Sequence, residues 1–205
     1  MFQDKDIPVV FFDRVEEGSE STKVIIDNYQ CGYQATKHLV EQGCRRIVMV
    51  TASLGRNVYE QRFLGYKAAL ADSGLPFDEQ HLLIKDLSEK CGVEAARQIL
   101  QMQPLPDGAF ITNDFSAAVC MQYLKEQGVR IPQDIAVVGF NNDTIGRIVE
   151  PSLTTIDYRG QDMGEIAARS LINHLQGISN IRHTNTIVIR SDLIIRKSSL
   201  RNGTA

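Results

Sequence analysis

The stretch that most constrains the fold runs over residues 109–143, AFITNDFSAAVCMQYLKEQGVRIPQDIAVVGFNND. Its apolar segments 109–112 and 135–140 predict two β-strands, the second rich in β-branched residues. Between them an Asn-Asp pair can cap a helix, and Gly128 suits the left-handed turn that ends one. A helix that connects two apolar strands implies parallel pairing, a right-handed crossover and a sheet covered on both faces.

The same alternation of strand and helix extends over most of the chain. Further strands are predicted at 8–12, 24–26, 46–51 and 82–84, and helices with one apolar face at 32–43, 58–73 and 93–100. After residue 143 the rhythm changes to a loop, a strand rich in Thr and Leu, an amphipathic helix and two short apolar stretches. This order predicts an α/β fold, a doubly wound, Rossmann-like parallel sheet.

Composition and charge exclude several classes of protein. The formal net charge is −3 and the chain has no long basic run, so we expect no nucleic-acid-binding surface within these residues. The four cysteines lie far apart without a CxxC pair, which favours a reduced cytosolic setting over zinc or disulfide chemistry: Cys31, Cys44, Cys91 and Cys120. The first residues do not read as a signal peptide and no run approaches a membrane span, so we expect a cytoplasmic protein without membrane contact.

Polar side chains follow every predicted strand. They are Asp13–Arg14, Asp27–Asn28, 51–57, Asp86, Asn113–Asp114 and 141–143. Turn chemistry alone favours Asp and Asn after strands, so each of them can be purely structural. Their joint occurrence is informative, because ligands of open parallel sheets sit at the carboxyl ends of the strands. Such a set of donors and acceptors suits a polyhydroxylated or heteroaromatic ligand.

Two arginines stand near these strand ends. Arg56 lies in the loop after the 46–51 strand, and Arg62 lies in the first turns of the next helix, beside Tyr59 and Phe63. The planar guanidinium suits bidentate contact with vicinal hydroxyls, a carboxylate or a ring oxygen and nitrogen. The spacing allows equally that Arg62 is an ordinary arginine of a helix surface.

Catalytic motifs are absent from the sequence. GxGxxG, GxxxxGK[ST] and GxSxG do not occur, and no histidine has a metal-ligand neighbour at i+4. The four histidines are expected at the surface or the edge of the core: His38, His81, His174 and His183. Asp13 and Asp114 could act as acid and base, but no nucleophile accompanies them. We therefore expect no enzymatic activity, no metal and no cofactor.

Several motifs resemble those of LacI/GalR-type transcriptional repressors. The 109–143 stretch is similar to their ND…A…L…G…(I/V)P.DI.V.GFD signature, PSLTTI to their PxLTT segment and RSDLIIRKS to their closing L..R.S strand. IPVVFFDR and GYQATKHLVEQGCRRIVMV also match, the latter with Cys44 in place of the usual His. In fixed order the motifs cover nearly all of 7–199. The resemblance implies two lobes of the type I periplasmic-binding-protein-like fold, joined by three crossings, with an effector in the cleft.

The resemblance also implies how the chain divides. Residues 28–156 plus 190–200 are expected to form a complete C-terminal effector-binding and dimerisation lobe, 7–27 plus 157–189 a remnant of the N-terminal lobe, and 201–205 a tail. The family's DNA-binding headpiece and first N-lobe strands are expected outside this chain, so operator DNA would be a partner only through that headpiece. Because a sheet without its other strands exposes an edge and apolar faces, we expect the remnant to be disordered, rearranged or paired with another chain.

Carried over residue by residue, the resemblance predicts an effector pocket. The candidates are Asp13, Arg56, Arg62, Leu87, Asn113, Asn141 and Tyr158. Arg62 occupies the place of the family's effector-binding arginine, whereas Asn141 stands where Asp is commoner and Leu87 where an aromatic residue is common. The GRN segment that contains Arg56 is similar to purine-type repressors. A sugar, a sugar acid and a purine-like nucleobase all remain open as the effector.

The family dimerises through the C-terminal lobe, and this places a candidate homodimer patch on helix 115–125 and loop 145–149. Its candidate contacts are Phe115, Ala118, Met121, Gln122 and Ile148. The leading interpretation is the effector-binding and dimerisation domain of a LacI-type regulator, in which a small molecule controls DNA binding allosterically. The alternative is a solute-binding protein of a sugar transport system with the same fold.

Overall fold

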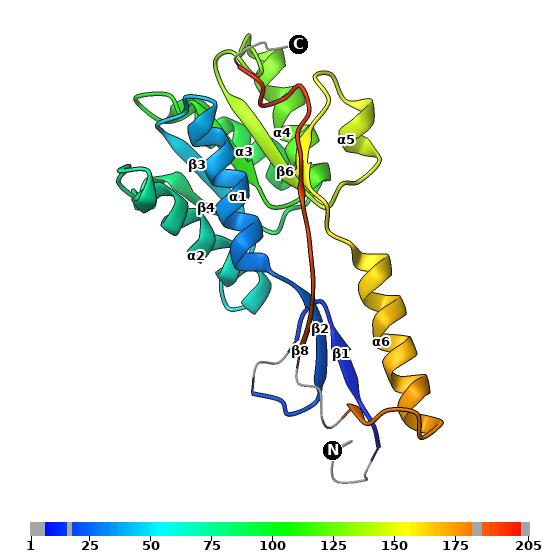
Figure 1. The fold of residues 1–205 in the computed structure, drawn as a ribbon. Helices are drawn as coiled ribbons and strands as arrows, with labels where there is room; N and C mark the ends of the chain where they lie inside the picture. The colour runs from blue at the N-terminus through cyan, green and yellow to red at the C-terminus, as the bar shows by residue number, and fades with distance from the viewer. Residues whose placement is uncertain (1–6, 16–17, 182–185, 202–205) are drawn as a thin grey trace.

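The computed structural model describes residues 7–15, 18–181 and 186–201 of the chain. Its strands form two sheets, which lie at opposite ends of the molecule (Figure 1). The larger has the order β4-β3-β5-β6-β7-β9 and, with helices α1 to α5, is called the six-stranded unit. The smaller has the order β1-β2-β8 and, with α6, is called the three-stranded unit.

The strands of the six-stranded unit are β3 (Ile47–Thr51), β4 (Leu82–Ile84), β5 (Gly108–Ile111), β6 (Ala136–Phe140), β7 (Thr154–Ile156) and β9 (Leu193–Ile194). Its helices are α1 (Asn28–Glu41), α2 (Asn57–Asp72), α3 (Glu89–Gln101), α4 (Asp114–Glu126) and the short α5 (Ile145–Ile148), and the 3-10 helix η2 spans Glu79–His81. Every strand pair of this sheet is parallel except β7 with β9. The predicted α/β class with a doubly wound parallel sheet is confirmed.

Two apolar cores cover the two faces of the large sheet. Successive side chains of a strand point to opposite faces, so Phe110 of β5 packs with α1 and α2, and Ile111 packs with α3 and α4. In β6, Phe140 joins the α1–α2 core and Val137 the other. Phe140 therefore faces the helix that carries Arg62.

Glycines bring α1 and α2 into backbone contact. A Cβ at Gly32 would lie 2.1 Å from the carbonyl oxygen of Arg62, and one at Gly65 would lie 2.0 Å from that of Tyr29. Only residues without a side chain allow this approach. The crossing sets Arg62 of α2 beside Asn28, the first residue of α1.

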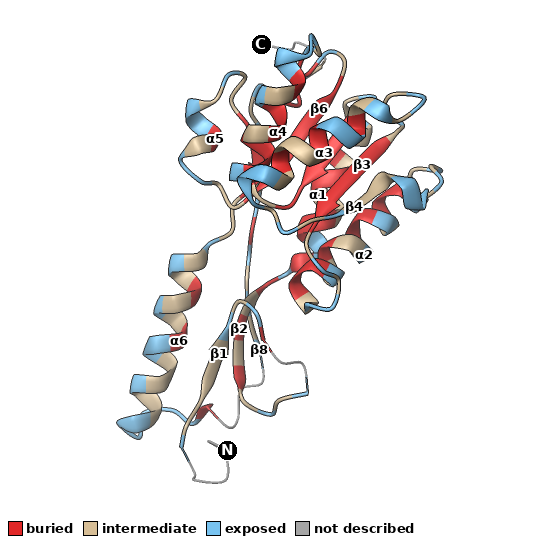
Figure 2. Cartoon of the chain, turned by 180° about the vertical axis from the view of Figure 1, so that it is seen from behind, coloured by how far each residue is buried: buried red, intermediate tan, exposed pale blue. Residues whose placement is uncertain are grey.

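The three-stranded unit contains β1 (Val10–Phe12), β2 (Thr22–Ile26) and β8 (Thr186–Ile189), all parallel, with α6 (Gly160–Leu175) packed against β1 and β2. Its described residues form a regular sheet and helix, which differs from the disorder or rearrangement expected of a remnant, whereas pairing with another chain stays a prediction. Exposed apolar side chains remain on it, among them Phe12, Leu175 and Val188. Figure 2 shows the contrast, with buried residues gathered in the six-stranded unit.

Three crossings join the two units (Figure 1). β2 runs into α1 at Asp27, whose carboxylate caps the helix by accepting from the Gln30 amide at 2.8 Å. Residues 157–159 lead from β7 to α6, and 190–192 lead from β8 to β9. The Asp157 amide donates to the Asp192 carbonyl at 2.9 Å, so the second and third crossings are held side by side.

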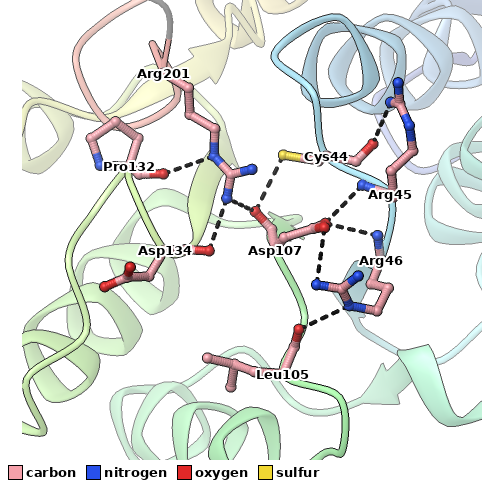
Figure 3. A network of polar contacts seen from close by, with 8 residues as sticks. All are labelled: Cys44, Arg45, Arg46, Leu105, Asp107, Pro132, Asp134 and Arg201. Atoms are coloured by element: carbon pink, nitrogen blue, oxygen red, sulfur yellow. Dashed lines mark hydrogen bonds and ion pairs between the residues drawn. The ribbon is translucent and has the colours of Figure 1, made fainter.

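Arg201, the last described residue, is hydrogen-bonded at the end of the large sheet where β5 and β6 begin (Figure 3). The Arg201 guanidinium donates to the carbonyl oxygens of Pro132 at 2.9 Å and Asp134 at 2.8 Å, and also to that of Asp107. The Asp107 carboxylate in turn pairs with Arg46 at 3.3 Å. The segment after β9 is thus hydrogen-bonded to the residues that lead into β5 and β6.

One expectation about the histidines is corrected by the structure. His38 is a buried core residue, not one of the surface or core edge, because α1 packs under the C-terminal segment and the ring Nε2 lies 2.7 Å from the Ser199 Oγ. His81 and His174 are half-buried. His183 lies outside the described residues.

Candidate functional site

A cavity of about 260 Å³ lies between the two units, at the carboxyl ends of β1, β5, β6 and β7. Its lining residues are Asp13, Arg14, Val58, Tyr59, Arg62, Thr112, Asn113, Asn141, Asp143 and Tyr158. The set matches the rule that ligands of open parallel sheets sit beyond the carboxyl ends of the strands. It also brings together five of the seven predicted pocket residues.

Arg62 is the most buried charged group of this cavity, with 5% of its surface exposed. Its Nε donates to Asn28 Oδ1 at 2.8 Å, and its guanidinium carbon lies 3.5 Å from the centroid of the Phe140 ring and 5.4 Å from that of Tyr59. Burial lowers the pKa of Arg62 to about 10, so the group stays charged at neutral pH. It is a buried and positioned group of the cavity lining and not an ordinary surface arginine.

Two asparagines at the ends of β5 and β6 face the cavity. Asn113 Oδ1 accepts from the Ser116 amide at 2.9 Å and caps α4, which leaves its amide NH₂ for a ligand. Asn141 has a φ of +126° and its Nδ2 donates to Asp143 Oδ2 at 3.3 Å. Left-handed backbone favours Asn and Asp among residues with side chains. Asparagine at 141 therefore tolerates this backbone conformation and also places its side chain at the cavity.

On the side of the three-stranded unit, Asp13 lies between two partners. Its carboxylate is 3.8 Å from the Arg14 Nε. Burial and a hydrogen bond to Asp13 both raise the pKa of Tyr158. Asp13 also has a left-handed φ of +63°, which turns the chain at the end of β1. Both Asp13 and Tyr158 thus present polar atoms to the cavity from the segments that cross or flank it.

Direct contacts join the two units beside the cavity. Asn57 Nδ2, at the start of α2, donates to the Val15 carbonyl at 3.0 Å. Arg14 donates to the Tyr59 hydroxyl at 3.3 Å. The second bond joins two residues that line the cavity, so a ligand there and the units' own contacts would act on the same relative orientation.

A buried carboxylate supports the cavity from behind. Asp114 is fully buried and accepts from the Thr155 hydroxyl at 2.7 Å and the Asp143 amide at 2.8 Å. Gly139 makes room for it, since a Cβ there would lie 2.2 Å from Asp114 Oδ1. Burial raises the pKa of Asp114 to about 6, against the opposing effect of its hydrogen bonds. Asp114 anchors the loop that carries Asn141 and does not itself face the cavity.

Two predicted pocket residues do not line the cavity. Arg56 is exposed and precedes the first turn of α2 without a side-chain capping bond. Leu87 has a φ of +62° and packs half-buried against the α3–α4 core. The pocket candidates carried over from the resemblance omitted five lining residues, all within three residues of a candidate: Arg14, Val58, Tyr59, Thr112 and Asp143.

A second, more apolar hollow of about 660 Å³ lies over α4 and α5. Four residues of the predicted dimer patch line it, namely Phe115, Ala118, Met121 and Gln122. Ile148 of α5 does not line it but is 71% exposed next to residues that do. Ala118 and Met121 are themselves buried, so Phe115, Gln122 and Ile148 are the members that a partner could cover.

Within the described ranges, no group of three or more His, Cys, Asp and Glu side chains could hold a metal ion. Among the helices of those same ranges, none is both long enough and apolar enough to cross a membrane. The cysteines of the described chain are free thiols, and burial raises the pKa of Cys31 to about 12.

Comparison with known proteins identifies the class to which this fold and cleft belong. Residues 36–199 match the periplasmic binding protein-like domain, and the chain belongs to this family. Within the family it is an effector-binding domain of the LacI type, in agreement with the motifs of the sequence.

The relatives are regulators of transcription. The chain is 32% identical over 196 residues to the HTH-type transcriptional repressor PurR of Vibrio atlanticus (strain LGP32), and 30% identical over 201 residues to the HTH-type transcriptional regulator CelR of Thermobifida fusca. These alignments cover 96% and 97% of this chain but 58% of each relative. The chain therefore spans less than two thirds of the length of the curated relatives it matches.

Solved structures agree with the sequence relatives. The transcriptional regulator CelR–cellobiose complex superposes with a TM-score of 0.88 at 29% identity, covering 96% of this chain and 60% of that one. The transcription regulator CcpA of Lactococcus lactis superposes with a TM-score of 0.88 at 25% identity, covering 97% of this chain and 72% of that one.

Proposed function

We propose that this chain is the effector-binding and dimerisation part of a LacI-type transcriptional regulator. The proposal rests on the cavity between the two units. There the buried guanidinium of Arg62 lies beside polar side chains that follow four strands. Asp13, Asn113, Asn141 and Tyr158 supply the remaining donors and acceptors. A regulator of this kind acts in the cytoplasm, where its operator DNA lies.

The proposed mechanism is a change in the relative orientation of the two units. A ligand in the cavity touches both units, so it favours the orientation in which both sets of contacts form. The bonds from Asn57 to Val15 and from Arg14 to Tyr59 belong to the same orientation. Coupling to the DNA affinity of the whole regulator should be of the order of 1–3 kcal/mol.

The dimer is proposed to form through α4 and α5. Phe115, which lines the apolar hollow, is 45% exposed, and Ile148 of α5, which precedes the lining residue Val149, is 71% exposed. A second copy would bury both side chains, and exposed apolar patches of this kind mark interaction sites.

The alternative of a solute-binding protein for transport receives less support. The relatives named above are all regulators of transcription, and the CelR complex shows that a protein with this fold holds a small molecule. We therefore favour control of transcription over solute delivery.

The test combines a ligand screen with operator binding. Sugars, sugar acids and nucleobases are screened by thermal shift, since a ligand that binds the folded state raises the melting temperature. For the compound selected, calorimetry should show that Arg62→Ala costs about 1.5–3 kcal/mol of binding energy, as for hydrogen bonds to a charged group.

Arg56→Ala is the matched control, because this arginine precedes the same helix but does not line the cavity. The selected compound should also change the operator affinity of the whole natural protein in a mobility-shift assay. Binding that is unaffected by Arg62→Ala, or operator affinity that no screened compound changes, would contradict the proposal.

A further inference from the structure

The loop after β6 carries an asparagine whose side chain bonds to both ends of the hinge and not to the cavity. Asn142 lies between Asn141 and Asp143, which both line the cavity. Its φ of +58° is left-handed, a conformation that asparagine tolerates better than most residues. Its half-buried side chain bonds to Arg196, in the segment after β9, and to Asp157, in the crossing from β7 to α6.

These two bonds fix the orientation of the Asn142 amide. Arg196 Nη2 donates to Asn142 Oδ1 at 2.7 Å, and Asn142 Nδ2 donates to Asp157 Oδ1 at 3.2 Å. A guanidinium can only donate and a carboxylate can only accept, so an amide satisfies both partners in this orientation alone. Arg196 is itself held by a bond from its Nη1 to the Leu153 carbonyl at 2.7 Å. The amide is therefore a fixed donor directed at the crossing.

Asp157 connects this donor to another crossing and to α6. Its backbone amide donates to the Asp192 carbonyl at 2.9 Å, in the segment from β8 to β9. Its Oδ2 lies 3.4 Å from Arg159 Nη1, and Arg159 Nε lies 2.9 Å from Asp162 Oδ2 in the first turn of α6. Because α6 packs against β1 and β2, the contacts that start at Asn142 extend into the three-stranded unit.

We propose that Asn142 is a positioning residue for the relative orientation of the two units, and that it acts through its bond to Asp157. Tyr158, which follows Asp157, lines the cavity, as do both neighbours of Asn142. A ligand that moves either segment therefore acts on this bond, and the bond acts on the direction in which α6 leaves the large sheet. This role rests on the proposed function for its regulatory consequence, whereas its test needs no ligand.

Distances between spin labels on the two units measure their orientation. Gln98→Cys on α3 and Ala168→Cys on α6 supply exposed labelling positions, in a Cys91→Ser background whose other cysteines are buried. The labelled protein is diluted with an excess of unlabelled protein, so that pulsed electron paramagnetic resonance reports distances within one chain. The parent should give one main distance peak.

Two variants remove the donor and keep a residue that tolerates the left-handed backbone. Asn142→Gly lacks the side chain, and Asn142→Asp keeps an acceptor for Arg196 but has no hydrogen to donate to Asp157. In both, the fraction of molecules outside the parent's peak should rise at least about tenfold, the factor expected for a hydrogen bond to a charged group. In Asp157→Asn, which keeps an acceptor for the Asn142 amide, this fraction should rise less than in either Asn142 variant.

Arg190→Ala is the matched control, because it removes an exposed ion pair with Asp192 on the neighbouring crossing and leaves the bonds of Asn142 intact. Its distance distribution should match that of the parent. A parent-like distribution in Asn142→Gly or Asn142→Asp, measured on variants with a native circular dichroism spectrum, would overturn the inference. Broadening by Arg190→Ala or Asp157→Asn that equals that of the Asn142 variants would also overturn it.

The outcome is independent of the ligand screen. If the Asn142 variants leave the distances unchanged while a screened compound alters operator affinity, the regulator function stands and the role of Asn142 is wrong. If the variants release the units but no compound binds, Asn142 positions the units and the proposed function fails.

Discussion

The guanidinium carbon of Arg62 lies 3.5 Å from the centroid of the Phe140 ring. The two residues come from α2 and β6, which meet on the same face of the large sheet. The ring offers its negative face to a cation that has lost its water, which offsets part of the desolvation cost. It cannot supply a counter-charge. The contact therefore holds the guanidinium in place for a ligand without satisfying it.

Because of this relationship, the Arg62 charge should lower the stability of the ligand-free protein while it favours ligand binding. Replacing Arg62 with Met keeps an unbranched apolar chain over Phe140 and removes the unpaired charge, so the free energy of unfolding of the ligand-free protein should rise by about 1 kcal/mol. Urea denaturation measures the change. Arg56→Met, at an exposed position, should stay within about 0.5 kcal/mol of the parent. A large loss of stability in Arg62→Met would mean that the protein's own groups already neutralise the guanidinium.

Gly65 should be intolerant of even one methyl group. The Cβ of Gly65→Ala would lie 2.0 Å from the Tyr29 carbonyl oxygen, so α1 and α2 must separate at a cost of about 1–3 kcal/mol. Gly164→Ala on α6 is the matched control. Its Cβ meets nothing within 4 Å, and alanine in place of glycine inside a helix should gain about 0.5–1 kcal/mol. Equal effects of the two substitutions in thermal unfolding would refute the close packing of α1 on α2.

Asp114 should make stability depend on pH. Burial raises its folded-state pKa to about 6 from an ordinary 3.8, so below pH 3.8 the folded state suffers no charge penalty. As the pH rises towards 6 the penalty grows, to about 3 kcal/mol. Asp114→Asn removes this penalty, so its free energy of unfolding relative to the parent should rise by about 3 kcal/mol between pH 4 and pH 7. The broken bond to the Asp143 amide lowers the free energy of unfolding of the variant by a constant amount at every pH.

Asp134→Asn is the control for this pH dependence. The side-chain hydrogen bond from Arg130 lowers the pKa of Asp134 to about 2, so its contribution to stability is lost only as the pH falls below the range tested. Urea denaturation at pH 4.5, 5.5, 6.5 and 7.5 should give nearly flat differences for Asp134→Asn and rising differences for Asp114→Asn. A flat series for Asp114→Asn would show that its carboxyl has an ordinary pKa.

The α4–α5 surface should control the oligomeric state. Phe115→Glu and Ile148→Glu place a charge on exposed apolar positions of the proposed patch, and burying an unpaired carboxylate at an interface is unfavourable. Sedimentation velocity should show dimers for the parent and monomers for both variants. Leu64→Glu, on the exposed side of α2, should remain dimeric. A parent that is monomeric at high concentration would count against the dimer itself.

Arg201 should contribute more to stability than an arginine of a surface ion pair. Its guanidinium donates to three carbonyl groups, those of Asp107, Pro132 and Asp134 (Figure 3). Arg201→Ala should cost about 2–4 kcal/mol, because the lost hydrogen bonds involve a charged donor. Arg169→Ala, which removes only an exposed pair with Glu165, should cost about 0.5 kcal/mol or less. Thermal unfolding that is equally shifted by both variants would rule out the anchoring role of Arg201.

The sequence by itself determined the order of helices and strands and much of the cavity. Hydrophobic periodicity and turn residues act over a few neighbours, so 109–143 could be assigned to strand, helix and strand from local rules. The rule that ligands bind at the carboxyl ends of parallel strands then selected a longer set, of which Asp13, Asn113 and Asn141 line the cavity whereas Asp27, Asp86 and Asp114 do not. The family resemblance narrowed that set, strengthened Arg62 and added Tyr158, which line the cavity as well, but it also added Arg56 and Leu87, which do not.

Only the tertiary structure decided which neighbours of those residues reach the cavity and which groups remain unpaired. Leu87 follows a strand in the same way as Asn113, but its left-handed backbone directs the side chain into the α3–α4 core. Arg56 and Arg62 are both arginines near one strand end, yet the glycine crossing of α1 and α2 buries one of them and leaves the other in solvent. Burial and charge compensation depend on residues distant in the chain, so no local pattern encodes them.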